Sequence, residues 1–157
     1  MNFLTLYWMI FTLTWFVILS IAVPRKKIIE LLPYGFFLGF IHSIVLNYFT
    51  VHHFKVWILQ GEIFIFGIPL FTSLAWISPV IIFSYYYPFN KQRSLQISYI
   101  LLFAAGIAMV NYFLSLANMW EINNWRFIYT FILAIFTHTI MVLFFPVFNV
   151  ESDKTNI

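Results

Sequence analysis

The sequence contains no cysteine and few charged residues, and each shortage excludes a class of protein. Without cysteine the chain forms no disulfide, no thiolate nucleophile and no cysteine-ligated metal site. Only 8% of the residues are charged, whereas a soluble domain carries about 25%. The eight lysines and arginines are scattered over short loops and make no basic face, so the net charge of +3 does not indicate a nucleic-acid partner.

Hydrophobic residues make up 63% of the 157 positions, and the mean hydropathy is +0.94. A soluble chain of this length buries only about 70% of the surface that it exposes on unfolding. Such a chain could not hide this much apolar surface from water, so lipid is the expected solvent. The first 23 residues contain no lysine or arginine, which argues against a cleavable signal peptide and indicates a retained span.

Five apolar runs are long enough to cross a bilayer, which takes about 20 helical residues. Their length and their lack of polar–apolar alternation favour helices over the strands of a barrel. The sequence therefore predicts an all-α fold, a single polytopic transmembrane helical bundle. The predicted spans are residues 3–23, 31–51, 63–87, 97–117 and 127–148, followed by a polar cytoplasmic tail at 149–157.

The distribution of lysine and arginine predicts the orientation, because cytoplasmic loops carry an excess of both. With the N-terminus outside, six basic residues face the cytoplasm and two face outward, which favours this orientation over the reverse. The inner set is Arg25, Lys26, Lys27, Lys91, Arg93 and Lys154, and the outer set is Lys55 and Arg126. The predicted location is the cell membrane, with a cytoplasmic C-terminus.

Tryptophans mark the two predicted outer loops. Trp57 lies in the loop at 52–62, and Trp120 and Trp125 lie in the loop at 118–125. Tryptophan favours the headgroup level of a bilayer, so these side chains are expected to anchor the loops in the membrane interface. A rim that contacts a ligand is the functional alternative.

The third predicted span contains Pro69 and Pro79. A proline inside a helix removes one hydrogen bond and usually kinks the axis. The sequence therefore predicts a bent third helix. The bend serves either packing or, alternatively, a hinge in a transport cycle.

Small and polar residues form stripes along three of the predicted helices. Placed at 100° per residue, Gly35, Gly39 and Ser43 form a track of small residues that lets two helix backbones approach closely. Ala104 and Ala108 do the same on the fourth span. The polar members of the stripes are expected to meet in the centre of the bundle, and they are His42, Asn47, Asn111 and His138.

Two interpretations of this polar centre remain open. It is either structural, with hydrogen bonds between helices worth about 0.6 kcal/mol each, or a path for a small ligand, a lipid headgroup or protons. No aspartate, glutamate, lysine or arginine lies centrally in any span, which weakens a proton-coupled transporter and an ion-selective pore. His52 and His53 are adjacent and point apart, so they do not predict a metal site, and no cofactor-binding motif occurs.

Several short motifs resemble a family of small multi-pass membrane proteins common in endospore-forming Firmicutes. That family shows a Y-P-F-N-like loop before one span and a G-W-K-like turn before the last span. The corresponding residues are Tyr87-Pro88-Phe89-Asn90-Lys91, Tyr99-Ile100-Leu101, Asn124-Trp125-Arg126 and Tyr129, with Phe66-Gly67-Ile68-Pro69 in the preceding helix. The resemblance covers roughly residues 60–145 and implies a plasma or spore membrane, but no chemistry.

The sequence departs from that family at two places. The family tends to carry an acidic residue in the fourth span, where this chain has Asn111, and another near the end of the second span, where it has Asn47 or Thr50. Amides still form hydrogen bonds, so a packing role survives these changes, whereas a proton-transfer role does not.

Three functional hypotheses follow. The first is a non-enzymatic membrane protein that acts by helix packing, by lipid contact, or by binding itself or another membrane protein. The second is a small permease or channel component. The third is a membrane enzyme acting on a lipid, which would need Glu62 or Glu121 to approach His42 or His138.

Overall fold

Helices dominate the fold in the computed structural model, which describes residues 3–61, 63–123 and 125–150. The all-α class predicted from the sequence is confirmed, with two small antiparallel sheets added. Each of the five predicted runs overlaps one helical segment in the described part of the chain. The segments are α1 (Phe3–Ala22); α2 (Arg25–Tyr34), η1 (Gly35–Ile41), α3 (His42–Tyr48) and η2 (Phe49–His53) in continuous series; α4 (Leu70–Ala75) with α5 (Ile77–Tyr86); α6 (Arg93–Leu116); and α7 (Phe127–Leu143).

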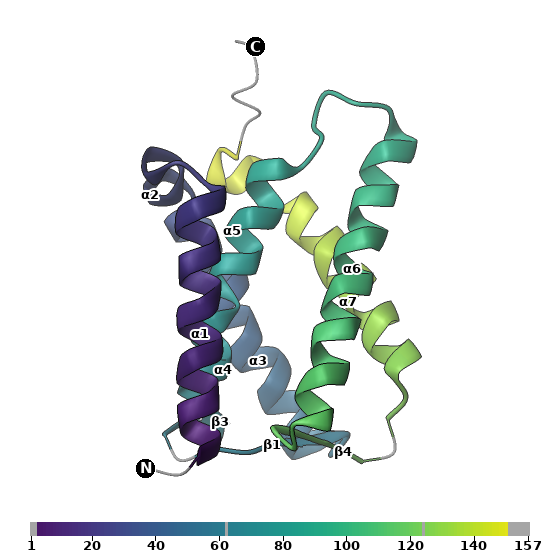
Figure 1. The fold of residues 1–157 in the computed structure, drawn as a ribbon. Helices are drawn as coiled ribbons and strands as arrows, with labels where there is room; N and C mark the ends of the chain where they lie inside the picture. The colour runs from purple at the N-terminus through teal and green to yellow at the C-terminus, as the bar shows by residue number, and fades with distance from the viewer. Residues whose placement is uncertain (1–2, 62, 124, 151–157) are drawn as a thin grey trace.

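Successive segments run in opposite directions, so the connections gather at two ends of the molecule (Figure 1). One end holds the start of α1 and the four strands, and we call it the β end. The opposite end holds residues 24–27 and 87–93, and we call it the basic end. The strands are β1 (Trp57–Leu59), β2 (Phe64–Ile65), β3 (Ile68–Pro69) and β4 (Trp120–Ile122), and the sheets are β1–β4 and β2–β3.

The second helical segment begins six residues earlier than the prediction of 31–51. Pro24 has an extended backbone (φ −58°, ψ 139°) and the helix starts directly after it, at Arg25. The basic residues predicted in a loop therefore lie on the first helical turn, where Lys27 pairs with Glu30 at 2.8 Å. Pro33 falls inside this segment, and the wide π-helical turns of η1 follow it.

The third predicted span is not one helix, and the prediction that Pro69 kinks it is wrong. Residues 64–69 form the β2–β3 hairpin, because Phe66 and Gly67 both adopt positive φ (51° and 78°), as a tight hairpin turn requires. Pro69 lies immediately before α4, where its missing N–H costs no helical hydrogen bond.

The remaining helix at 70–86 is interrupted at Trp76, between α4 and α5. Pro79 lies three residues later and has no N–H to donate to the carbonyl of Ala75. The interruption therefore directly follows Ala75, the residue whose carbonyl lacks a helical donor because of this proline.

The fifth segment also differs from its predicted range of 127–148. α7 ends at Leu143, and a short 3-10 helix, η3 (Pro146–Phe148), follows it. Val150, assigned from sequence to the polar tail, is buried and donates its backbone N–H to the Phe145 carbonyl at 3.0 Å. The rest of the predicted tail, residues 151–157, lies outside the described residues.

Buried apolar side chains form two clusters, one near each end. The cluster at the basic end includes Tyr34, Ile81, Phe83 and Phe145, which come from α2, α5 and the end of the chain. The cluster at the β end is formed by Trp8, Trp57, Leu59, Ile68, Met119 and Trp120. The space between these two clusters holds the candidate site.

Candidate functional site

The track of small residues in the second segment packs directly against the helix at 70–86. A Cβ atom added to Gly39 would lie 2.7 Å from the carbonyl oxygen of Trp76, and one added to Gly35 would lie 2.6 Å from Cγ1 of Ile81. Ser43 continues the track, and its Oγ lies 3.5 Å from that of Ser73. The structure thus places the predicted packing residues at the closest approach of two helices.

Asn47 connects this helix pair to the β end. Its amide nitrogen donates to the carbonyl oxygen of Ser43 at 2.8 Å and to Ser43 Oγ at 3.2 Å. Its carbonyl oxygen accepts a hydrogen bond from the indole N–H of Trp57 at 3.2 Å. Both ends of this buried amide are therefore bonded within the protein, which fits a structural role for Asn47.

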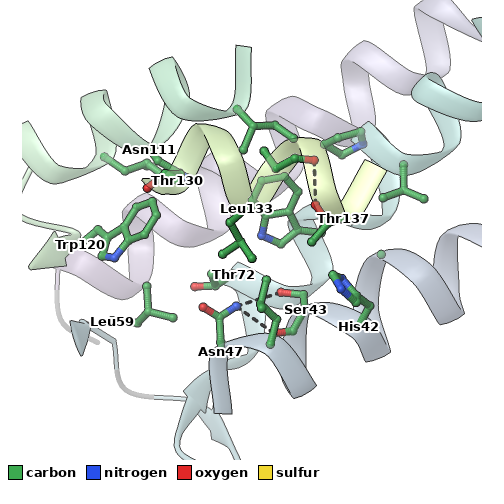
Figure 2. Close-up of a pocket in the computed structure, with 18 of the residues that line it drawn as sticks. His42, Ser43, Asn47, Leu59, Thr72, Asn111, Trp120, Thr130, Leu133 and Thr137 are labelled. Carbon is green, nitrogen blue, oxygen red and sulfur yellow. Dashed lines mark hydrogen bonds between the residues drawn. The ribbon is translucent and has the colours of Figure 1, made fainter. Parts of the chain in front are cut away.

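A cavity of about 100 Å³ lies between the two apolar clusters. Helices α1, α3, α4, α5, α6 and α7 all contribute to its wall, and β1 and β4 close it toward the β end (Figure 2). The four residues predicted to form the polar centre all line this cavity, and they are His42, Asn47, Asn111 and His138. The structure therefore brings them to one site from three separate helical segments.

The cavity wall contains buried polar groups that have no protein partner among the described residues. The hydroxyl of Thr72 and the indole N–H of Trp120 are both in this state, although the two side chains are only 5% and 6% exposed. Leaving such a group unsatisfied costs about 1–3 kcal/mol, so each requires an explanation.

The hydrogen bond of His138 determines which of its ring nitrogens can accept. Nδ1 lies 2.7 Å from the carbonyl oxygen of Ala134, which can only accept, so Nδ1 carries the proton. In the neutral ring Nε2 is then an acceptor. The ring also packs edge-on against Phe83, with centroids 4.7 Å apart.

Two tryptophans close the β end of the cavity. Trp57 on β1 and Trp120 on β4 meet edge-to-face with centroids 5.0 Å apart, and Trp8 of α1 donates its indole N–H to the Gln60 carbonyl at 2.7 Å. Trp57 and Trp120 are both buried in the protein. The prediction that these two side chains anchor the loops in the membrane interface is therefore wrong, because strand pairing turns both rings inward.

The α6–α7 pair forms the other side of the cavity. Ala104 is completely buried, whereas Ala108, one turn further along α6, is half-buried.

Near the basic end the hydroxyl of Tyr99 on α6 donates to the Phe83 carbonyl at 3.0 Å. Tyr34 on α2 donates in the same way to the Met141 carbonyl of α7, also at 3.0 Å.

The chemistry available in the cavity is that of neutral groups. Hydroxyls, amides, indoles and imidazoles line it, and no carboxylate of the described residues does. Glu121 on β4 is exposed, and Glu62 lies outside the described residues. Within those residues there is also no group of three or more histidines and acids that could hold a metal ion.

Sequence reasoning missed Thr72 and Trp120 as members of the site. The signal for Trp120 was weak, because pairing of β1 with β4 joins residues about 60 positions apart in the chain. The buried–exposed–buried pattern of Trp57, Ile58 and Leu59 is typical of a strand, but three residues are too few for a prediction.

Comparison with known proteins adds no name to this site, because no protein-family model, curated protein or solved structure matches the chain.

Proposed function

We propose that this chain is a non-enzymatic integral membrane protein that crosses the bilayer five times and acts through noncovalent contacts in the membrane. The observation that carries the proposal is the large amount of apolar surface that the helices expose. Large apolar side chains cover much of the outside of the helices, and buried polar side chains line the cavity between the two apolar clusters.

Exposed large apolar side chains occur on α1, α2, α3, α6 and α7, whereas the helix at 70–86 exposes only Tyr86 among the residues of this kind. Ile21 of α1 is 82% exposed, Leu102 of α6 is 70% exposed and Phe136 of α7 is 62% exposed. A monomeric soluble protein rarely exposes apolar patches larger than a few hundred Å². Lipid contact gives these side chains a favourable environment.

Helix length agrees with this proposal. Three helices are long and apolar enough to cross a membrane, and they are Phe3–Ala22, Arg25–His53 and Arg93–Leu116. The other two apolar helices, Leu70–Tyr86 and Phe127–Leu143, are shorter. The 17 residues of α7 are at the lower limit of the length that spans hydrocarbon, about 17–25 residues.

The two ends of the bundle differ in charge, which supports the proposed orientation. The basic end carries five lysines and arginines of the described chain together with Glu30, and the β end carries two, Lys55 and Arg126, together with Glu121. Because cytoplasmic loops are enriched in basic residues, we propose that the basic end faces the cytoplasm. The N-terminus is then outside, and the family resemblance suggests the cell membrane of an endospore-forming bacterium.

The neutral cavity supports a non-enzymatic role over lipid hydrolysis or transfer. General acid–base catalysis needs a group that gains or loses a proton within reach of the reacting atom, usually with a partner that orients it. His42 and His138 line the cavity without a described carboxylate beside them. Hydrogen bonding and packing are what the arrangement offers.

Single cysteines test the topology without background, because the chain has none of its own. We expect Lys55→Cys to react with a membrane-impermeant maleimide in intact cells, and Lys91→Cys to react only after permeabilisation. The reverse pattern would overturn the proposed orientation. Labelling of both positions from outside would place them on the same side of the membrane. That result would contradict the single crossing that we propose between them.

A small permease is the second candidate, and one observation favours it. The cavity lies against the helix at 70–86 where that helix breaks, at Trp76, three residues before Pro79. A break beside a cavity resembles the discontinuous helices that transporters use. Flux of a neutral solute into proteoliposomes that is lost on replacing Asn111 with leucine would favour this candidate over a purely structural role.

A further inference from the structure

We propose that the central cavity binds one small uncharged molecule that carries a hydroxyl group on an apolar body. The proposal concerns the cavity itself and does not depend on the direction in which the chain crosses the membrane. It follows from the hydrogen-bonding groups left unpaired, from the absence of charge in the described wall, and from the size of the space.

The unpaired groups indicate that something polar completes the site. In Figure 2 the Thr72 hydroxyl and the Trp120 indole nitrogen point toward the same hollow, which Leu59 and Leu133 flank. Both side chains are more than nine-tenths buried and have no partner among the described residues. Buried polar groups are normally bonded to protein or to an ordered molecule, so a molecule held in the hollow, a ligand or a water, is expected to satisfy them.

The types of unpaired group point to a hydroxyl. The indole N–H of Trp120 can only donate, so the ligand must offer an acceptor. The Nε2 atom of His138 can only accept while Nδ1 donates to Ala134, so a donor is also useful. Thr72 and Asn111 can do both. A hydroxyl group is the smallest group that donates and accepts at once.

The rest of the wall specifies an uncharged, partly apolar ligand. No aspartate, glutamate, lysine or arginine of the described residues lines the cavity, so an ion would lack the charged partner that it needs away from water. Apolar side chains such as Leu46, Ile107, Leu114 and Leu133 line the remainder. These surfaces favour contact with carbon rather than with a second polar group.

The volume limits the size of the ligand. An engineered cavity of about 150 Å³ accommodates benzene, which has six heavy atoms. A cavity of about 100 Å³ therefore suits a molecule of about four or five heavy atoms. Short-chain alcohols fall in this range, and lipids with complete acyl chains do not.

The experiment uses 2-bromoethanol and 1-bromopropane, two probes of equal heavy-atom number that differ by a hydroxyl in place of a methyl group. Bromine quenches tryptophan fluorescence on contact, and Trp8, Trp57, Trp76 and Trp120 line the cavity. With the full-length protein in lipid nanodiscs, we expect 2-bromoethanol to give a saturable component of quenching. We expect 1-bromopropane to quench only in linear proportion to its concentration, through the lipid.

Two matched variants locate the site. Thr72→Val removes the hydroxyl at constant shape and should raise the half-saturating concentration of 2-bromoethanol about five-fold, the effect of one net hydrogen bond. Thr14→Val makes the same change on α1, where the exposed hydroxyl bonds to Ile10 within its own helix, and should leave that concentration unchanged.

Three results would overturn the proposal. Linear quenching by both probes would mean that the cavity holds only water, and equal saturation by both would show that the hydroxyl is not recognised. An unchanged half-saturating concentration in folded Thr72→Val would place the binding elsewhere. Should that variant fail to fold, the comparison of the two probes on the wild-type protein still tests whether a hydroxyl is recognised. Maleimide labelling measures topology separately, so failure here leaves the membrane proposal intact.

Discussion

Replacing Gly39 with alanine would add a methyl group where two helix backbones touch. The new Cβ atom would lie 2.7 Å from the carbonyl oxygen of Trp76, and 2.9 Å and 3.0 Å from Cα and N of Ile77. All three neighbours are backbone atoms, so no side-chain rotation relieves the contact. Ordinary contact begins at 3.4 Å, so one helix must retreat by about 0.7 Å, the difference between 3.4 and 2.7 Å.

That displacement sets the expected cost. A gap of about 0.5–1 Å forfeits a quarter to a half of the dispersion energy of each contact that it opens. Inserting a carbon atom into a packed interface costs about 1–3 kcal/mol, and the backbone origin of this clash leads us to expect about 2 kcal/mol. Gly35→Ala should cost less, because its nearest neighbours are the flexible side-chain tips of Ile81, at 2.6 and 2.9 Å.

The assay is equilibrium unfolding of the purified protein in mixed micelles with increasing dodecyl sulfate, followed by circular dichroism. Gly106→Ala is the matched control, because a Cβ atom there would meet nothing within 4 Å. We expect the free energy of unfolding to fall most for Gly39→Ala, less for Gly35→Ala and not at all for Gly106→Ala. Equal stability of the position 39 and position 106 variants would refute the close approach of these helices.

Two further substitutions test buried hydrogen bonds. Asn47→Ala leaves the indole N–H of Trp57 without its acceptor and should lower the free energy of unfolding by about 1–3 kcal/mol, with the loss visible as a shift in tryptophan emission. Tyr34→Phe removes the bond to the Met141 carbonyl and should cost about 1 kcal/mol in the same unfolding assay. Tyr7→Phe, on an exposed face of α1, should change nothing, and an equal loss there would argue against the buried bond.

Helical periodicity was sufficient to anticipate much of the bundle interior. Gly35, Gly39 and Asn47 repeat at the spacing of one helix face, and each is buried in the structure. Periodicity reports which face of a helix turns inward, and it does so even where the helix contains π-helical turns. Neither the bounds of that helix nor its neighbours could be obtained in the same way, because both depend on contacts with other segments.

Hydropathy alone could not separate a hairpin from a helix at 64–69. Apolar residues such as Phe64 and Ile65 suit both structures, and the turn is marked only by Gly67 and by Pro69 close behind it. The pairing of β1 with β4 carries even less local signal, because Trp57 pairs with Ile122, 65 positions further along the chain. The closed end of the cavity therefore could not be predicted from the sequence.

The most direct test of the central claim is the environment of an outward-facing side chain. A nitroxide attached to Leu102→Cys on α6, where the native side chain is 70% exposed, reports its surroundings through relaxation by oxygen and by a water-soluble nickel chelate. In vesicles we predict strong relaxation by oxygen and little by the chelate, with the opposite ranking for a nitroxide at Glu121→Cys on β4. Stronger relaxation by the chelate at position 102 would show that water, not lipid, surrounds this helix, and would contradict the proposal that the chain spans a membrane.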